Sequence, residues 1–107
     1  MGYDLTAVGK GAEGKMMFNS DHHWTASGWS HFLDWLARWG VNTEELNVAN
    51  EGKVVSAATC GIIAGTIREF KHSFDNDLLG GDLSHGGAGK EAKFWEQYEK
   101  AGGAVIG

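Results

Sequence analysis

Residues 21–40, DHHWTASGWSHFLDWLARWG, decide the fold of this 107-residue chain. Apolar side chains recur there at the spacing of one helix face, which predicts an amphipathic helix. The residues on that face are Trp29, Phe32, Leu33 and Leu36. Thr25 or Ser27 can cap the start of the helix, because the side-chain oxygen accepts from a backbone N–H that has no partner in the helix. Gly40 is the expected C′ residue that ends it.

Four of the five tryptophans lie in this segment, at positions 24, 29, 35 and 39. Trp29 is on the core face of the helix. Trp35 and Trp39 extend one edge of that face, where we expect them to seal an interface between copies of the chain. Trp24 precedes the helix and lies off the core face, so it is the best candidate for stacking on a planar ligand.

The chain on both sides of this segment supplies the remaining elements. They are expected to be a strand at 3–8, its hairpin partner at 15–18, a helix at 57–72, a loop at 75–89, a helix at 90–101 and a strand at 104–106 that pairs with the first. Ser56 is the expected N-cap of the second helix. The residues expected on the buried face of that helix are Cys60, Ile63, Ala64, Ile67 and Phe74. These elements predict one α+β domain over residues 1–107, in which three helices pack on a small two- or three-stranded antiparallel sheet.

The charge balance and the single cysteine narrow the functional classes. Nine Lys and Arg stand against 14 Asp and Glu, a formal charge of −5, and the cationic residues form no basic stripe. Because domains that bind nucleic acid present such a stripe, we expect no nucleic-acid partner. No apolar run approaches the roughly 20 residues of a membrane span, so we expect no membrane partner. The lone Cys60 fits a reducing compartment, and we expect a cytoplasmic protein.

The triplet Asp21-His22-His23 is similar to the D-H-H motif of one phosphoesterase family. Those enzymes use further aspartate motifs to hold two metal ions, and this chain is too short to carry them. A metal here would need more ligands, and the usual ligand spacings are missing. The candidates for such ligands are His31, His72 and His85. The other interpretations of the triplet are polar contacts to a bound ligand or solvated loop residues.

Residues 86–90, GGAGK, precede the last expected helix. Small residues let backbone N–H groups approach an anion, the helix dipole favours it, and Lys90 adds positive charge. A P-loop needs the pattern G-x-x-x-x-G-K-[ST], but Ser84 stands at its first position and Glu91 follows the lysine. The segment is therefore either a phosphate-binding turn unlike a P-loop or a flexible linker.

Several landmarks of the chain resemble those of a known family. They are the opening MGYDL of residues 1–5, Gly14, Phe18-Asn19, Trp24, Leu33, the turn Asn50-Glu51-Gly52, a helix containing Ala64, and a Phe94-Trp95 helix that runs into Ala101-Gly102-Gly103. In these, the chain resembles a family of small bacteriophage and prophage proteins that begin MGYDL, carry an aromatic-rich F-x-N…W block, and end in a helix, Gly-Gly and a strand. It departs from that family at residues 21–23 and in its glycine-rich loop. The resemblance implies a phage-encoded accessory protein of a kind that often blunts host defences by binding something.

Together these features lead us to expect a non-enzymatic binding protein in the host bacterial cytoplasm. We expect it to sequester a small phosphorylated signal of nucleotide type used in host immunity, such as a cyclic nucleotide or an ADP-ribose derivative. It would act as a homo-oligomer, without catalytic residue, metal or cofactor. A base would stack on an indole, and a phosphate would lie at a helix N-terminus. The expected ligand-binding residues are Asn19, His22, His23, Trp24, His85 and Lys90.

Two alternatives stay open at this point. An acidic chain with exposed tryptophans can act as a protein–protein inhibitor of a host defence protein. The second alternative is a metal-assisted phosphodiesterase that uses His22, His23 and His85. The small-ligand hypothesis depends on Trp24 and Lys90 converging in space.

Overall fold

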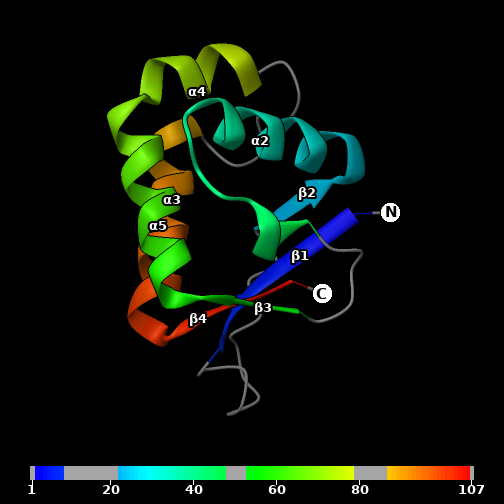
Figure 1. Ribbon diagram of the computed structural model, residues 1–107, viewed down its shortest axis with the longest axis vertical. Coiled ribbons are helices and arrows are strands. Elements are labelled where there is room, and N and C mark those ends of the chain that lie inside the picture. Colours follow the sequence, from blue (N-terminus) through cyan, green and yellow to red (C-terminus); the bar gives the residue numbers. More distant parts are fainter. Residues whose placement is uncertain (1, 9–21, 48–52, 79–86, 107) are drawn as a thin grey trace.

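The computed structural model describes residues 2–8, 22–47, 53–78 and 87–106. Its elements are β1 (Gly2–Ala7), β2 (His23–Thr25), α2 (Ala26–Arg38), η1 (Glu44–Leu46), β3 (Lys53–Ser56), α3 (Ala57–Glu69), α4 (Lys71–Leu78), α5 (Gly87–Ala101) and β4 (Gly103–Ile106). These ranges thus hold four α-helices and a four-stranded sheet (Figure 1). The predicted α+β class is confirmed, with one helix and one strand more than expected. None of the helices in these ranges is long and apolar enough to cross a membrane.

The sheet has the strand order β2-β1-β4-β3, and all neighbouring strands are antiparallel. Leu5 lies opposite Ile106, so the predicted pairing of the first and last strands is confirmed. Leu5, Val55 and Ile106 are buried, whereas Val54 is exposed, because successive side chains of a strand point to opposite faces. β2 and β3 are absent from the sequence prediction, since each has only three or four residues and leads directly into a helix.

The ends of the helices follow the predicted capping residues. The Thr25 hydroxyl accepts from the backbone N–H of Gly28 at 3.0 Å, and the Ser56 hydroxyl accepts from that of Thr59 at 3.3 Å. Both residues have extended backbone conformation, as N-caps do. Gly40 has a φ of +87° just beyond α2, a conformation that favours glycine, so its predicted role in ending the helix is confirmed.

The predicted helix over 57–72 is wrong at its C-terminal end. α3 ends at Glu69, and α4 follows almost directly, so Phe74 belongs to α4 and not to the buried face of α3. Packing against α2 explains why the chain turns here. The indole N–H of Trp35 donates to the Ser73 hydroxyl at 3.0 Å, and the Phe74 ring packs edge-on against Trp35.

The predicted loop over 75–89 is also wrong at both ends, because 75–78 lie in α4 and 87–89 in α5. A contact between these two ends explains the difference. The Asp75 carboxylate accepts from the backbone N–H of Ala88 at 2.9 Å, which supports the start of α5. Tertiary contacts therefore outweigh the low helix propensity of this stretch. The middle of that loop and the predicted hairpin partner of the first strand lie outside the described residues.

The tryptophans of residues 21–40 contribute to the core where the helices meet the sheet. Trp24, Trp29 and Trp35 are buried, and Trp24 stacks on Phe32 with ring centroids 4.8 Å apart. The prediction that Trp35 lies at a surface edge is wrong, because α4 covers it. Trp39 is 39% exposed, so it is the one of these four tryptophans that solvent reaches to a large extent.

Candidate functional site

A buried carboxylate on α5 is the centre of the polar interior. Both His22 and Glu91 are fully buried, and the His22 Nε2–H donates to Glu91 Oε2 at 2.7 Å. The indole N–H groups of Trp24 and Trp95 donate to the same oxygen at 3.2 and 2.9 Å. Burying a carboxylate is costly unless donors surround it, and three N–H groups converge here. We name this set the Glu91 cluster: His22, Trp24, Glu91, Trp95 and Tyr98.

The His22 imidazole connects three elements of the fold. Its ring stacks on Phe94 with centroids 4.1 Å apart, and its Nδ1 lies 2.6 Å from the Tyr98 hydroxyl. That hydroxyl also donates to the backbone carbonyl of Leu5 at 3.4 Å, and the His22 carbonyl accepts from the Leu5 N–H at 3.2 Å. His22 therefore holds β1 and the start of β2 against α5. Enclosed in this way, the Glu91 cluster acts as an internal anchor for α5.

The neighbouring histidine points to the opposite side of the sheet. His23 Nδ1 lies 2.6 Å from an Asp4 carboxylate oxygen across the β1–β2 pair, and both side chains are about half exposed. His22 and His23 separate because adjacent side chains alternate in extended chain. The structure therefore does not bring the two histidines to one site. Within the described ranges, no three His, Cys, Asp or Glu side chains are placed to hold a metal ion.

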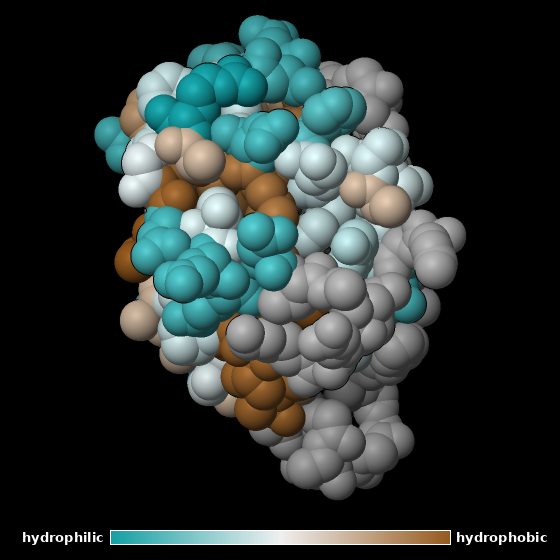
Figure 2. Space-filling view, turned by 45° about the vertical axis from the view of Figure 1, so that its right-hand side comes forward, coloured by the Kyte–Doolittle hydropathy of each residue, from teal (hydrophilic) through white to brown (hydrophobic). Residues whose placement is uncertain are grey.

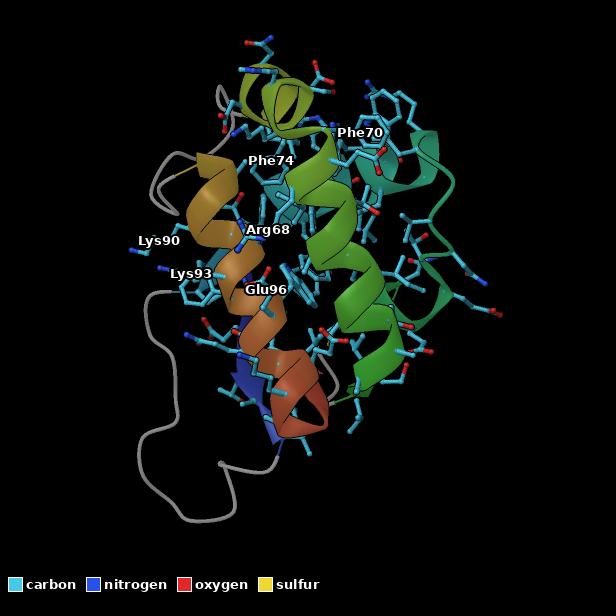
Figure 3. The ribbon with its side chains drawn as sticks, turned by 90° about the vertical axis from the view of Figure 1, so that its left-hand side faces the viewer. Arg68, Phe70, Phe74, Lys90, Lys93 and Glu96 are labelled. Carbon is cyan, nitrogen blue, oxygen red and sulfur yellow. The ribbon has the colours of Figure 1, made fainter. Side chains whose placement is uncertain are left out.

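Lys90 lies on the outer side of α5, although its neighbour Glu91 faces the core. Successive residues of an α-helix are about 100° apart, so the two side chains diverge. Figure 3 shows Lys90 and Lys93 projecting away from the body of the molecule. At the N-terminus of the same helix, the Ala88 N–H is already bonded to the Asp75 carboxylate. The position predicted for a ligand phosphate at that N–H is thus held by a side chain of the protein.

The outer side of α5 joins α3 through a paired arginine. The Arg68 Nε–H donates to Glu96 Oε2 at 2.5 Å and its Nη2–H donates to Oε1 at 2.9 Å (Figure 3). This two-bond contact holds the pKa of the Glu96 carboxyl below its usual value, with smaller contributions from the positive charges of Lys100 and Lys93. Positive side chains therefore gather on this surface of an acidic protein. The expectation that the cationic residues form no stripe is wrong here, because the packing of α3 against α5 brings Arg68 to the lysines of α5. We name this set the cationic stripe: Arg68, Lys90, Lys93 and Lys100.

The predicted ligand residues lie in separate regions of the structure. His22 and Trp24 meet in the interior, His23 lies on the outer face of the sheet and Lys90 on the outer side of α5. Trp24 touches Glu91, one residue from Lys90, so the two segments converge, but the indole is buried and stacked on Phe32. Asn19 and His85 lie outside the described residues.

Two functional features escape the sequence analysis. Glu91 lies on the buried stripe of α5 with Ala88, Ala92 and Trp95, and a charged residue at such a position is a signal that could have been found. Its partner could not, because His22 is 69 residues away in the chain. The ion pair between Arg68 and Glu96 likewise depends on how α3 and α5 pack.

Comparisons of the chain with models of protein families, with curated proteins and with solved structures gave no significant match. The candidate site is therefore defined by its geometry alone. The Glu91 cluster lies on the inner side of α5, and the cationic stripe lies on its outer side. The space-filling view shows hydrophilic surface over much of the described part, with apolar patches between (Figure 2).

Proposed function

We propose that this protein is a non-enzymatic binding protein that sequesters a small phosphorylated ligand of nucleotide type. The observation that carries the proposal is the cationic stripe on the outer side of α5. Four of the nine lysines and arginines of the chain belong to it, in a protein with a formal charge of −5. Such a local concentration of positive charge favours the binding of an anionic ligand at this place on the surface.

The interior of the domain supports this surface. Glu91 ties the inner side of α5 to β2 through His22, and its neighbour Lys90 lies on the outer side. A helix held in this way presents its lysines from a fixed backbone, which lowers the entropy lost when a ligand binds. In the proposal, His22 and Trp24 therefore position the binding surface, while Lys90 and Lys93 contact the ligand.

The biological part of the proposal comes from the resemblance to small phage proteins. It is sequestration, in the host cytoplasm, of a phosphorylated signal of host immunity such as a cyclic nucleotide or an ADP-ribose derivative. Asn19 and His85 remain predicted contacts, and assembly into a homo-oligomer remains predicted. His23 is no longer included, because it lies on the outer face of the sheet and not on the outer side of α5. A protein that only sequesters its ligand needs tight binding without turnover, so no catalytic group is invoked.

Thermal-shift and calorimetric titration with cyclic di- and trinucleotides and ADP-ribose tests the proposal. We expect at least one of them to bind with a Kd in the micromolar range or below. Lys90→Glu and Lys93→Glu should each weaken that binding at least tenfold, because each reverses a charge beside the ligand. The matched control is Lys71→Glu, which makes the same charge change at an exposed position of α4. Absence of binding to every nucleotide, or equal weakening by the control, would refute the proposal.

A second candidate function is inhibition of a host protein, and the aromatic pair of exposed Trp39 and partly buried Phe70 favours it. The two rings stack in parallel with centroids 3.9 Å apart, and Trp39 is 39% exposed. Tryptophan is enriched among the residues that dominate protein–protein interfaces. Capture of one stoichiometric protein from host lysate, lost in Trp39→Ala and kept in Lys93→Glu, would select this function over ligand sequestration.

A further inference from the structure

Glu96 occupies the middle of the cationic stripe. Lys90, Lys93, Glu96 and Lys100 follow one another along one side of α5 at the spacing of neighbouring turns. Arg68 reaches this row from α3 and donates two hydrogen bonds to the Glu96 carboxylate, while Lys93 and Lys100 act on the same carboxylate through their charge. One anionic group is therefore surrounded by three cations from two helices.

A guanidinium that binds a carboxylate through two parallel hydrogen bonds can bind a phosphate in the same way. The side chains of Arg68 and Glu96 are 48% and 38% exposed, so solvent and solutes reach the contact. Exposed ion pairs of this kind contribute little to stability, and the Glu96 side chain can move away without disturbing the core. A phosphate with a charge near −2 competes well for three cations against a carboxylate with a charge of −1.

We propose that Arg68, Lys93 and Lys100 form a phosphate-binding site that Glu96 fills in the absence of ligand. Glu96 is then a built-in competitor, and a phosphate group binds by displacing its carboxylate from Arg68. The ligand class is a phosphate monoester or a diphosphate, because a terminal phosphate offers the oxygens that a guanidinium holds in pairs. The choice of a phosphorylated ligand rests on the proposed function, whereas the competition itself rests on the contacts of Glu96.

The test uses the full chain and inorganic phosphate and pyrophosphate as probes, with binding followed by backbone amide chemical shifts. In Glu96→Gln we expect the affinity for pyrophosphate to rise about tenfold, because the competing charge is gone while the shape of the side chain is kept. The shifted amides should cluster on α3 and α5 around position 68. In the double variant with Arg68→Gln, the gain should disappear.

Glu99→Gln is the matched control, because Glu99 is another exposed carboxylate of α5 and its oxygens lie against Gly61 and not against Arg68. An equal gain in this control would mean a general charge effect and would overturn the inference, as would the absence of any gain in Glu96→Gln. Circular dichroism and the dispersion of amide shifts establish that each variant is folded.

The two proposals can fail separately. If a nucleotide binds the unaltered protein through Lys90 and Lys93 but Glu96→Gln leaves its affinity unchanged, the competitor role is wrong and the proposed function stands. If Glu96→Gln gains affinity for pyrophosphate but no nucleotide binds any variant, the phosphate site stands and the proposed function is wrong.

Discussion

His22 Nε2 and Glu91 Oε2, 69 positions apart in the chain, form a fully buried hydrogen bond of 2.7 Å. A charge in the core is tolerated only where polar partners replace water, and here two indole N–H groups and an imidazole do so. The pair joins the sheet to the last helix at the point where the tryptophan-rich segment begins. It therefore links the hydrophobic core to the surface on which we place the ligand.

Glu91→Gln should destabilise the domain strongly. The substitution keeps the shape of the side chain but removes the negative charge that His22 and two indoles approach, and breaking a buried pair costs about 3–5 kcal/mol. Urea unfolding followed by circular dichroism measures the free energy of unfolding. Glu99→Gln, at an exposed position of the same helix, should change it by less than about 0.5 kcal/mol. Similar values for the two variants would show that the buried pair contributes no net stability.

The two conservative variants Trp24→Phe and Trp39→Phe should differ. Trp24→Phe leaves Glu91 with one donor fewer and removes buried surface, so we expect a loss of about 1–3 kcal/mol. Trp39 is partly exposed, and its indole N–H makes no hydrogen bond to the described residues, so Trp39→Phe should cost under about 1 kcal/mol. Urea unfolding of both variants gives the comparison, and a larger loss at position 39 would contradict the assignment of Trp24 to the core.

The pairing of the first and last strands and the caps of α2 and α3 follow from local rules, and the sequence is enough to predict them. Thr25, Ser56 and Gly40 each bond to a residue three positions away, and a helix face repeats every three or four residues. The candidate site is different. That Glu91 faces His22 is decided by how distant elements pack, which no local pattern contains.

The two histidines show a second reason for the difference between prediction and structure. Adjacent in sequence, they suggest one site, but the extended backbone at the start of β2 sends His22 inward and His23 outward. The three-residue strand that causes this separation is too short to predict from its residues. The prediction that Trp35 lies at a surface edge failed for a similar reason. Trp35 is covered by α4, and the Asp-Asn-Asp sequence of that helix is typical of a loop.

Cys60 should be unreactive in the folded protein. Burial, together with the negative charges of Glu45 and Glu99, raises the pKa of its thiol to about 12, so almost no thiolate exists at pH 8. A thiol reagent such as DTNB should therefore modify it only at the rate of unfolding, with full reaction in denaturant. Rapid modification under native conditions would contradict its burial on α3.

The same raised pKa has a consequence for stability at alkaline pH. The thiol is neutral in the folded state up to about pH 12, whereas in the unfolded chain it ionises near 9, so its contribution to stability is complete below pH 9 and is lost as the pH rises toward 12. Cys60→Ala should remove this part of the alkaline loss. The difference in the free energy of unfolding between the two proteins, measured at pH 7 and at pH 10, reports it.

The bond between Arg68 and Glu96 should weaken in acid. Because the hydrogen bonds of Arg68 lower the pKa of Glu96, the stabilising contribution is present above the usual carboxyl pKa of 4.5 and is lost as the pH falls through the lowered value. The stability difference between the unaltered protein and Glu96→Gln should thus be largest near pH 7 and shrink toward pH 3. A difference that is constant over this range would mean that the pair does not couple to folding.

Two glycine-to-alanine substitutions at tight positions should have opposite effects. A Cβ at Gly61 would lie 2.5 Å from an oxygen of the exposed Glu99 side chain, which can swing away, so the helix gains the higher propensity of alanine, up to about 1 kcal/mol. A Cβ at Gly103 would lie 2.5 Å from the backbone carbonyl oxygen of Val55, which is fixed in the β3–β4 pair, and φ is +136° there. Gly103→Ala should therefore cost about 1–3 kcal/mol. Thermal unfolding of both variants measures the two signs. A destabilised Gly61→Ala would mean that Glu99 is fixed over α3, and a neutral Gly103→Ala would mean that the last strand can shift away from β3.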